Sequence, residues 1–316
     1  MSQALNELQK KRLHSLEPKL NKAIQSQDFV TAKDIVIDIQ SVLRPTQHYV
    51  RLIQSKNKLY ELAIELNKCD FALKGLMSNK SLINKNTRIY LETISLLAIC
   101  YLRMRDVPNA KKYIQEVLQN RFVIKTERTR EVFNSEIINR FNEEIALATL
   151  TSSNIAVLDE EEIERESIRL IQTLTDDEIF ANIGQASPTS TKDLIFLVHD
   201  FSTKQLPSAE RLALPSPNQK TQDKEVGLTV FESVKRVLYN SLCNPESEIY
   251  KVWYNNGMQL VLSKGYIKST IISSLVNIGF GFSMIAASII ALVTKFGIEV
   301  YCTKYKPIYV SEIRKK

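Results

Sequence analysis

Residues 94–120 read ISLLAICYLRMRDVPNAKKYIQEVLQN, and this stretch contains the pattern that decides the fold. Its apolar residues recur at spacings of three and four on both sides of a short polar turn at Arg105 and Asp106. Because side chains three and four positions apart share one face of a helix, the pattern predicts two amphipathic helices joined by that turn. A small residue, Ala110, lets the second helix pack closely against the first. The stretch therefore predicts a helical hairpin.

The same hairpin pattern occurs twice earlier in the chain, beginning at Ala23 and Ala63, so that the three blocks start 40 and then 38 residues apart. Such hairpins bury their apolar faces only against the next hairpin, which predicts an all-α fold with an N-terminal α-solenoid. A non-repeating helical bundle with the same core residues is the alternative. The aligned packing positions are Ala23, Phe29, Ala32, Val36 and Ile39; Ala63, Cys69, Ala72, Leu76 and, after a longer last offset, Ile83; and Tyr101, Val107, Ala110, Ile114 and Val117.

The third block resembles a tetratricopeptide repeat, because Leu97, Ala98, Tyr101, Ala110 and Ile114 occupy the positions where that family places its packing residues. The resemblance covers at most residues 15–120. The family's Trp is missing, Arg105 stands in place of the turn Gly, and the period exceeds about 34 residues, so a different helical-repeat family stays open. The resemblance implies a concave surface that binds a protein partner, and no catalysis.

A second feature is the uncharged stretch Ser269–Thr294, STIISSLVNIGFGFSMIAASIIALVT. At ~1.5 Å per residue one helix of this length crosses a ~30 Å hydrocarbon layer. Small and polar residues gather on one side of that helix, where they would let helices associate in lipid. The stretch is therefore an anchor, an associating helix that forms oligomers, or a buried helix of a soluble domain. The residues of the association face are Asn277, Gly279, Gly281, Ser283 and Ala287.

The flanks of this stretch predict its placement. Lys and Arg are concentrated after it, which favours a cytoplasmic tail, whereas the absence of an apolar secretory signal at the N-terminus keeps the large N-terminal region in the cytosol. One crossing cannot satisfy both, and a tail anchor with a short translocated tail follows the N-terminal region. We therefore expect a single-pass membrane protein whose large N-terminal region is cytoplasmic, with a re-entrant hairpin hinged at Gly279–Gly281 as the alternative. Trp253 fits a small helical core nearly as well as a membrane interface. The predicted interfacial anchors are Trp253, Tyr254, Tyr266, Lys268, Lys295 and Tyr301.

The composition limits the chemical classes of binding partner that the chain is expected to have. The 316 residues carry a net charge of +7, which favours an anionic partner. The basic residues near the apolar stretch favour a membrane surface over nucleic acid, since no aromatic stacking pattern accompanies them. The four cysteines, Cys69, Cys100, Cys243 and Cys302, have no metal-site spacing and are predicted to be reduced thiols in the cytosol.

The remaining motifs indicate no catalytic reaction and no metal or cofactor site. His199 and Asp200, after the short apolar run 194–198, would be half of a hydrolase site, but no nucleophile motif accompanies them. Glu143 and Glu144 are expected on a solvated helix face. We predict no catalytic, cofactor-binding or metal-binding residue and no cofactor.

The sequence thus predicts a non-enzymatic, membrane-anchored adaptor or scaffold that binds a protein partner through its repeats. The alternative is an oligomerising, pore-type effector that perturbs a membrane, compatible with a bacterial defence system, with the repeats as its sensor. The predicted organisation is a repeat domain (1–150), a helical connecting region (151–205), a Pro-rich linker (206–227), juxtamembrane amphipathic helices (228–268), a transmembrane helix (269–294) and a basic tail (295–316).

Overall fold

The computed structural model describes residues 3–151, 158–208, 219–245, 247, 250–251 and 266–315. Over these residues the chain is helical, apart from turns and one isolated antiparallel bridge between Thr151 and Phe280. The all-α prediction is confirmed. The chain divides into two compact units: unit 1 is Met1–Ile138, Phe201–Arg211 and Ile308–Lys316, and unit 2 is Asn139–Asp200 and Leu212–Pro307.

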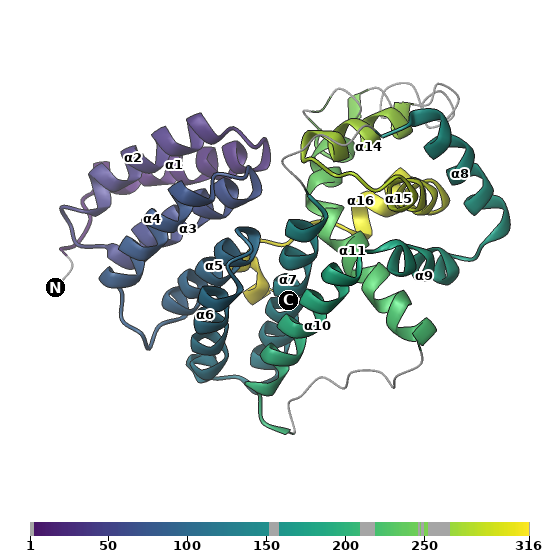
Figure 1. Ribbon diagram of the computed structural model, residues 1–316. Coiled ribbons are helices and arrows are strands. Elements are labelled where there is room, and N and C mark those ends of the chain that lie inside the picture. Colours follow the sequence, from purple (N-terminus) through teal and green to yellow (C-terminus); the bar gives the residue numbers. More distant parts are fainter. Residues whose placement is uncertain are drawn as a thin grey trace. The chain divides into compact units, whose positions relative to one another are not determined.

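Unit 1 begins with three successive antiparallel helix pairs (Figure 1). Each helix contacts the next one along the chain, and α3 also contacts the first helices of the neighbouring pairs, α1 and α5. A short 3-10 turn, η1 (Arg121–Val123), leads to α7 (Glu127–Leu150), which continues into unit 2. The pairs are α1 (Glu7–Gln25) with α2 (Phe29–Leu43), α3 (Tyr49–Glu65) with α4 (Cys69–Leu82), and α5 (Arg88–Arg103) with α6 (Val107–Gln119).

The three pairs turn in the same way. Gln27, Asn67 and Arg105 each adopt a left-handed backbone conformation, with φ of 56°, 56° and 59°. The N–H of the following residue then donates back to a carbonyl in the last turn of the first helix, which closes the helix end. These hydrogen bonds are Asp28 N to Ala23 O (2.9 Å), Lys68 N to Ala63 O (2.7 Å) and Asp106 N to Tyr101 O (2.9 Å).

Small residues set the distance between paired helices in unit 1. Ala32, Ala72 and Ala110, one in each second helix, are fully buried. At Gly75 of α4 an added Cβ would lie 2.1 Å from the ring of Tyr60 in α3. The close contact of α3 with α4 therefore depends on a glycine at this position.

Unit 2 is built around α15 (Ser283–Phe296), whose residues 285–293 are all buried. α15 contacts α8, α9, α14 and α16, and α9 packs closely against α11. Helix α11 begins inside the segment 206–227 that the sequence predicts as a linker. The other helices are α8 (Glu160–Thr173), α9 (Asp176–Ala186), α10 (Thr189–Lys204, of which the last residues belong to unit 1), α11 (Gln219–Leu242), α14 (Tyr266–Asn277) and α16 (Ile298–Lys304).

The uncharged stretch Ser269–Thr294 is not one helix. It is broken between α14 and α15, where Gly279 has a φ of 73° that favours glycine. The prediction of one continuous helix over this stretch is therefore wrong, and the break includes Gly279–Gly281, where the alternative placed a hinge. Among the residues described, no single helix is long and apolar enough to span a membrane; α15 and α16 pass that test only together, as a pair bent by 99°.

A disulfide joins Cys243, just after α11, to Cys302 in α16, with a Cα–Cα distance of 5.5 Å. The prediction of four reduced thiols is wrong for this pair, because helix packing in unit 2 brings together two residues 59 positions apart. Cys69 and Cys100 are free and buried in unit 1.

Candidate functional site

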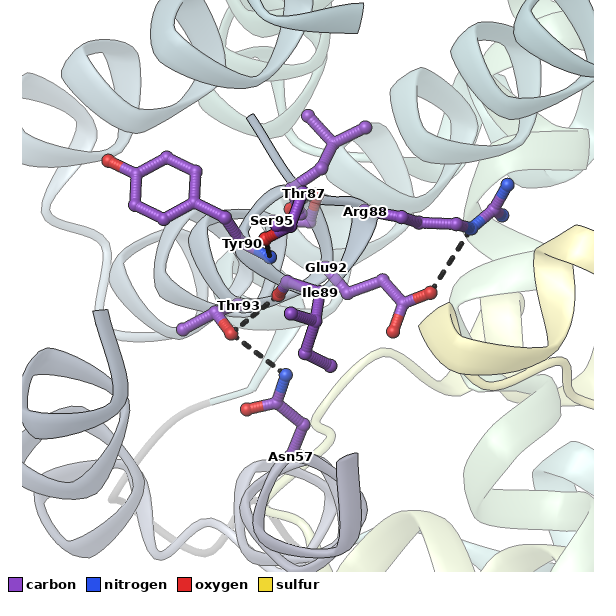
Figure 2. Close-up of polar contacts among 9 residues, drawn as sticks. Asn57, Thr87, Arg88, Ile89, Tyr90, Glu92, Thr93 and Ser95 are labelled. Carbon is purple, nitrogen blue, oxygen red and sulfur yellow. Dashed lines mark hydrogen bonds and ion pairs between the residues drawn. The ribbon is translucent and has the colours of Figure 1, made fainter. Parts of the chain in front are cut away.

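A chain of buried polar side chains crosses three helices of unit 1. Asn79 of α4 donates through Nδ2 to Oδ1 of Asn57 in α3 (3.0 Å), and Asn57 Nδ2 donates to Oγ1 of Thr93 in α5 (2.9 Å). Thr93 completes the chain by donating to the carbonyl oxygen of Ile89 (2.8 Å), as Figure 2 shows together with the contact from Asn57. The second and third helix pairs are therefore joined by directional bonds as well as by apolar packing.

These bonds fix the register of α3 on α5. Asn57, Asn79 and Thr93 are all buried, and a buried polar group that loses its partner costs about 1–3 kcal/mol. A shift of α5 along α3 would break the contact from Asn57 to Thr93, so the polar chain favours one alignment of the two helix pairs.

Two buried carboxylates lie on the same pair of helices. Glu61, one turn after Asn57 in α3, is 1% exposed, and Glu92 in α5 is 2% exposed. Arg88 Nε lies 3.2 Å from Glu92 Oε1, and both side chains extend from α5 in Figure 2. Buried carboxylates persist where cations or hydrogen-bond donors compensate them. We call the part of α3 and α5 that carries Asn57, Glu61, Arg88 and Glu92 the α3–α5 surface.

A second polar network joins α4, α5 and α6. Lys80 Nζ donates to Glu116 (2.8 Å), the Tyr90 hydroxyl donates to the same carboxylate, and Lys80 lies 4.8 Å from the ring centroid of Tyr113. Burial alone would raise the pKa of Glu116, but the hydrogen bonds from Lys80 and Tyr90 outweigh it and hold that pKa below its ordinary value. Burial and the neighbouring carboxylate raise the pKa of Tyr90. This network stabilises the third pair against the second.

A surface pocket of about 650 Å³ lies between α1 and α3. Arg51 on its wall binds Glu17 through two hydrogen bonds of 2.6 and 2.9 Å. The remaining wall comes from the turn before α3 and from polar residues of that helix, including Lys58. The pocket thus already contains a formed ion pair.

His199 lies on α10, and its Nδ1 accepts a hydrogen bond from Asn142 Nδ2 (2.7 Å). Burial lowers the pKa of His199, and the adjacent Asp200 partly opposes this shift. Consecutive residues of a helix point about 100° apart, so His199 and Asp200 do not form a facing pair. Within the described ranges, no three His, Cys, Asp or Glu side chains are grouped to hold a metal ion.

The carboxylates expected on a solvated face of α7 lie inside unit 2. Glu144 is buried beside Arg140, with Nε and Oε1 2.6 Å apart, and Glu143 contacts Lys235 Nζ of α11 at 3.1 Å. That expectation is wrong, because the part of α7 from Asn139 onward belongs to unit 2 and its carboxylates pair with Arg140 and Lys235 there.

The residues predicted to associate helices in a membrane do not form one row. Asn277 is exposed at the end of α14, and Gly279 and Gly281 lie in the turn that follows. Ser283 begins α15, and Ala287, one turn later, is buried in unit 2. The spacing of four residues from Gly279 to Ser283 is thus interrupted by the turn, so these side chains do not share one helix face.

The predicted interfacial anchors take part in contacts within unit 2 where they are described. Lys268 pairs with Glu164 of α8, and Lys295 lies 2.9 Å from Asp176 of α9. Tyr301 is fully buried. Tyr266 begins α14, whereas Trp253 and Tyr254 lie outside the described residues.

The functional residues that sequence patterns miss are Asn57, Glu61, Asn79, Glu92 and Thr93. Their signal was a polar residue at a position where the helical period calls for an apolar one, which periodicity alone treats as noise.

Comparison of the chain with models of protein families, with curated proteins and with solved structures finds no match.

Proposed function

We propose that unit 1 is an α-solenoid, similar to tetratricopeptide repeats, that binds a protein partner through the α3–α5 surface as a non-enzymatic adaptor or scaffold. The repetition of one turn geometry at Gln27, Asn67 and Arg105 supports a stacked repeat. The contacts of α3 with both α1 and α5 support first helices that line one continuous side of the stack.

The observation that carries this proposal is the placement of buried charged residues on α3 and α5, the first helices of the second and third pairs. Arg88, Glu92 and Glu61 occupy one surface, although a helix stack needs only apolar residues to hold together. Charged groups within an interface contribute specificity and orientation. The α3–α5 surface therefore has the chemistry of a recognition surface.

A pair of charge reversals in the full chain tests the proposal. Arg88→Glu places a third carboxylate on the α3–α5 surface, whereas Lys33→Glu makes the same change at an exposed position of α2. Crosslinking followed by mass spectrometry should identify a protein that wild type and Lys33→Glu retain, and that Arg88→Glu retains about tenfold less. If every captured protein responds equally to both reversals, the α3–α5 surface is not the binding site.

A second candidate function is membrane perturbation by an oligomer, favoured by the 26 uncharged residues of Ser269–Thr294, which lie in α14, α15 and the break between them. In this proposal unit 2 opens and these two helices enter an anionic membrane, so that the protein acts at a membrane surface through its C-terminal region. Release of a dye from anionic vesicles should be abolished by Gly279→Leu and Ser283→Leu and retained by Ile285→Leu. Equal behaviour of the three variants would exclude this function.

A further inference from the structure

The segment Ile308–Ile313, far along the chain from the repeats, packs on unit 1. Its 3-10 turn η3 (Val310–Lys315) contacts α5, and Tyr309 packs against the apolar cluster of α1, α2 and α3. Val310 and Ile313 are 2% and 5% exposed. A 3-10 turn aligns side chains three positions apart, so these two residues lie on one side of the segment. The segment therefore presents an apolar face to the repeats.

One polar contact orients this segment. The main-chain N–H of Val310 donates to the carboxylate of Glu61, at 3.0 Å from each oxygen. Hydrogen bonds to an ionised acceptor are about twice as strong as neutral ones, and a buried carboxylate needs such donors. Because the donor is main chain, Glu61 recognises the backbone of the segment, while Val310 and Ile313 contribute buried apolar side chains.

The segment also carries its own turn. Glu312 N donates to Tyr309 O (2.8 Å), and Tyr309 N donates to the side chain of Glu312 (3.3 Å). These local bonds satisfy the backbone groups next to Val310 within the segment itself. These bonds move with the segment, which lowers the ordering cost when a short peptide of this sequence binds.

From these contacts we propose that the α3–α5 surface is a peptide-binding site and that residues 308–313 of the same chain are its resident, displaceable ligand. The inference rests on the proposed function of unit 1 and specifies its partner. That partner presents an aromatic residue, then an aliphatic residue with a free N–H, then a second aliphatic residue three positions later. The resident segment occupies the site until such a partner displaces it.

A partner has to compete with the resident segment for the site. Residues 308–313 and the helices α3 and α5 belong to one chain. Binding within one chain raises the effective concentration of the segment above that of a free peptide. A free peptide of the same sequence should therefore bind the wild-type chain weakly and bind a chain with a released segment much better.

The test uses the full chain and a fluorescent peptide of residues 306–316, KPIYVSEIRKK. Ile313→Asp places a charge in the apolar contact and releases the segment, and Tyr309→Ala is a second releasing variant without a new charge. Fluorescence anisotropy should show that both variants bind the peptide more than about tenfold tighter than wild type. Glu61→Gln added to Ile313→Asp should weaken binding by about tenfold, whereas Glu131→Gln at an exposed position should not.

A peptide with a methyl group on the Val310 nitrogen, which removes the N–H and keeps every side chain, should bind the released chains about tenfold more weakly. Equal binding of the unmodified peptide to wild type and to both released variants would overturn the resident-ligand proposal, while a partner sensitive to Arg88→Glu would still support the proposed function. The absence of binding to either released variant, with helix content intact by circular dichroism, would also overturn it. A wild-type dimer that Ile313→Asp dissociates would overturn the intrachain arrangement.

Discussion

The backbone of Gly184 in α9 lies directly against Asp223 in α11: a Cβ added to Gly184 would be 1.8 Å from the Asp223 carbonyl oxygen. Gly227, one turn further along α11, has the same relationship to the carbonyl oxygen of Phe180. Two helices thus approach at a pair of glycines, and the neighbouring rings of Phe180 and Phe231 pack edge to face at 5.6 Å.

This contact predicts that Gly→Ala substitutions at these two positions lower the stability of the protein, the opposite of their usual effect inside a helix. Gly→Ala inside a helix normally stabilises by about 1 kcal/mol. At Gly184 or Gly227 the added methyl group meets backbone atoms that cannot move aside, so each substitution should destabilise unit 2 by about 3 kcal/mol. Urea unfolding followed by circular dichroism measures this change. Gln185→Ala, at an exposed position of α9, is the matched control; a stability gain for Gly184→Ala would show that the helices are further apart.

The left-handed backbone that the three turns share predicts that glycine substitutions at the left-handed residues stabilise the protein. A left-handed conformation costs an L-residue about 1–2 kcal/mol, and Asn tolerates it better than Arg. Arg105→Gly should therefore raise the thermal midpoint of unfolding, and Asn67→Gly should raise it less. Met104→Gly, one residue earlier and outside the left-handed region, should lower it by removing a helix former. A lower midpoint for Arg105→Gly than for Met104→Gly would contradict the turn geometry.

Two buried tyrosines should respond oppositely to loss of the hydroxyl group. In the described part of the chain the Tyr301 hydroxyl has no hydrogen-bond partner, whereas the Tyr90 hydroxyl donates to Glu116. Tyr301→Phe should stabilise the protein by about 1 kcal/mol, and Tyr90→Phe should destabilise it by about 1–2 kcal/mol. Equilibrium unfolding of both variants measures this difference, and destabilisation by Tyr301→Phe would reveal a bond to the hydroxyl.

The lowered pKa of Glu116 predicts a pH dependence of stability. A carboxyl group whose pKa is lower in the folded state stabilises the fold above its ordinary pKa, here 4.5, and loses that effect as pH falls through the folded-state pKa. Glu116→Gln should therefore be less stable than wild type at neutral pH, and the gap should close below pH 4.5. Unfolding curves across this range test the sign. Glu131→Gln, which removes an exposed carboxylate, is the control, and a gap independent of pH would contradict the assignment.

The hairpins of unit 1 could be predicted from sequence because their signals are local. The period of three and four, the polar turns and the small residues Ala32, Ala72 and Ala110 all lie within single blocks. The left-handed residues at the turns could not be recognised by type, because Gln27 and Arg105 are not residues that favour this conformation.

The errors concern contacts between distant segments. Hydropathy predicted one helix over Ser269–Thr294, but packing of α15 against α8 and α9 allows a break at Gly279. The pairing of Cys243 with Cys302 and the burial of Glu144 likewise depend on the folded chain. The contact between Glu61 and Val310 spans 249 positions, so no local pattern could pair the two residues.

Hydrogen exchange at Val310 is the measurement that tests the central claim most directly. The account predicts that the Val310 amide of the wild-type chain exchanges slowly, because it is bound to Glu61 in a buried site, and that Glu61→Gln speeds its exchange by about tenfold while Glu131→Gln leaves it unchanged. Rapid exchange of Val310 in wild type, equal to that of the Ile313→Asp variant, would show that the segment does not occupy the α3–α5 surface.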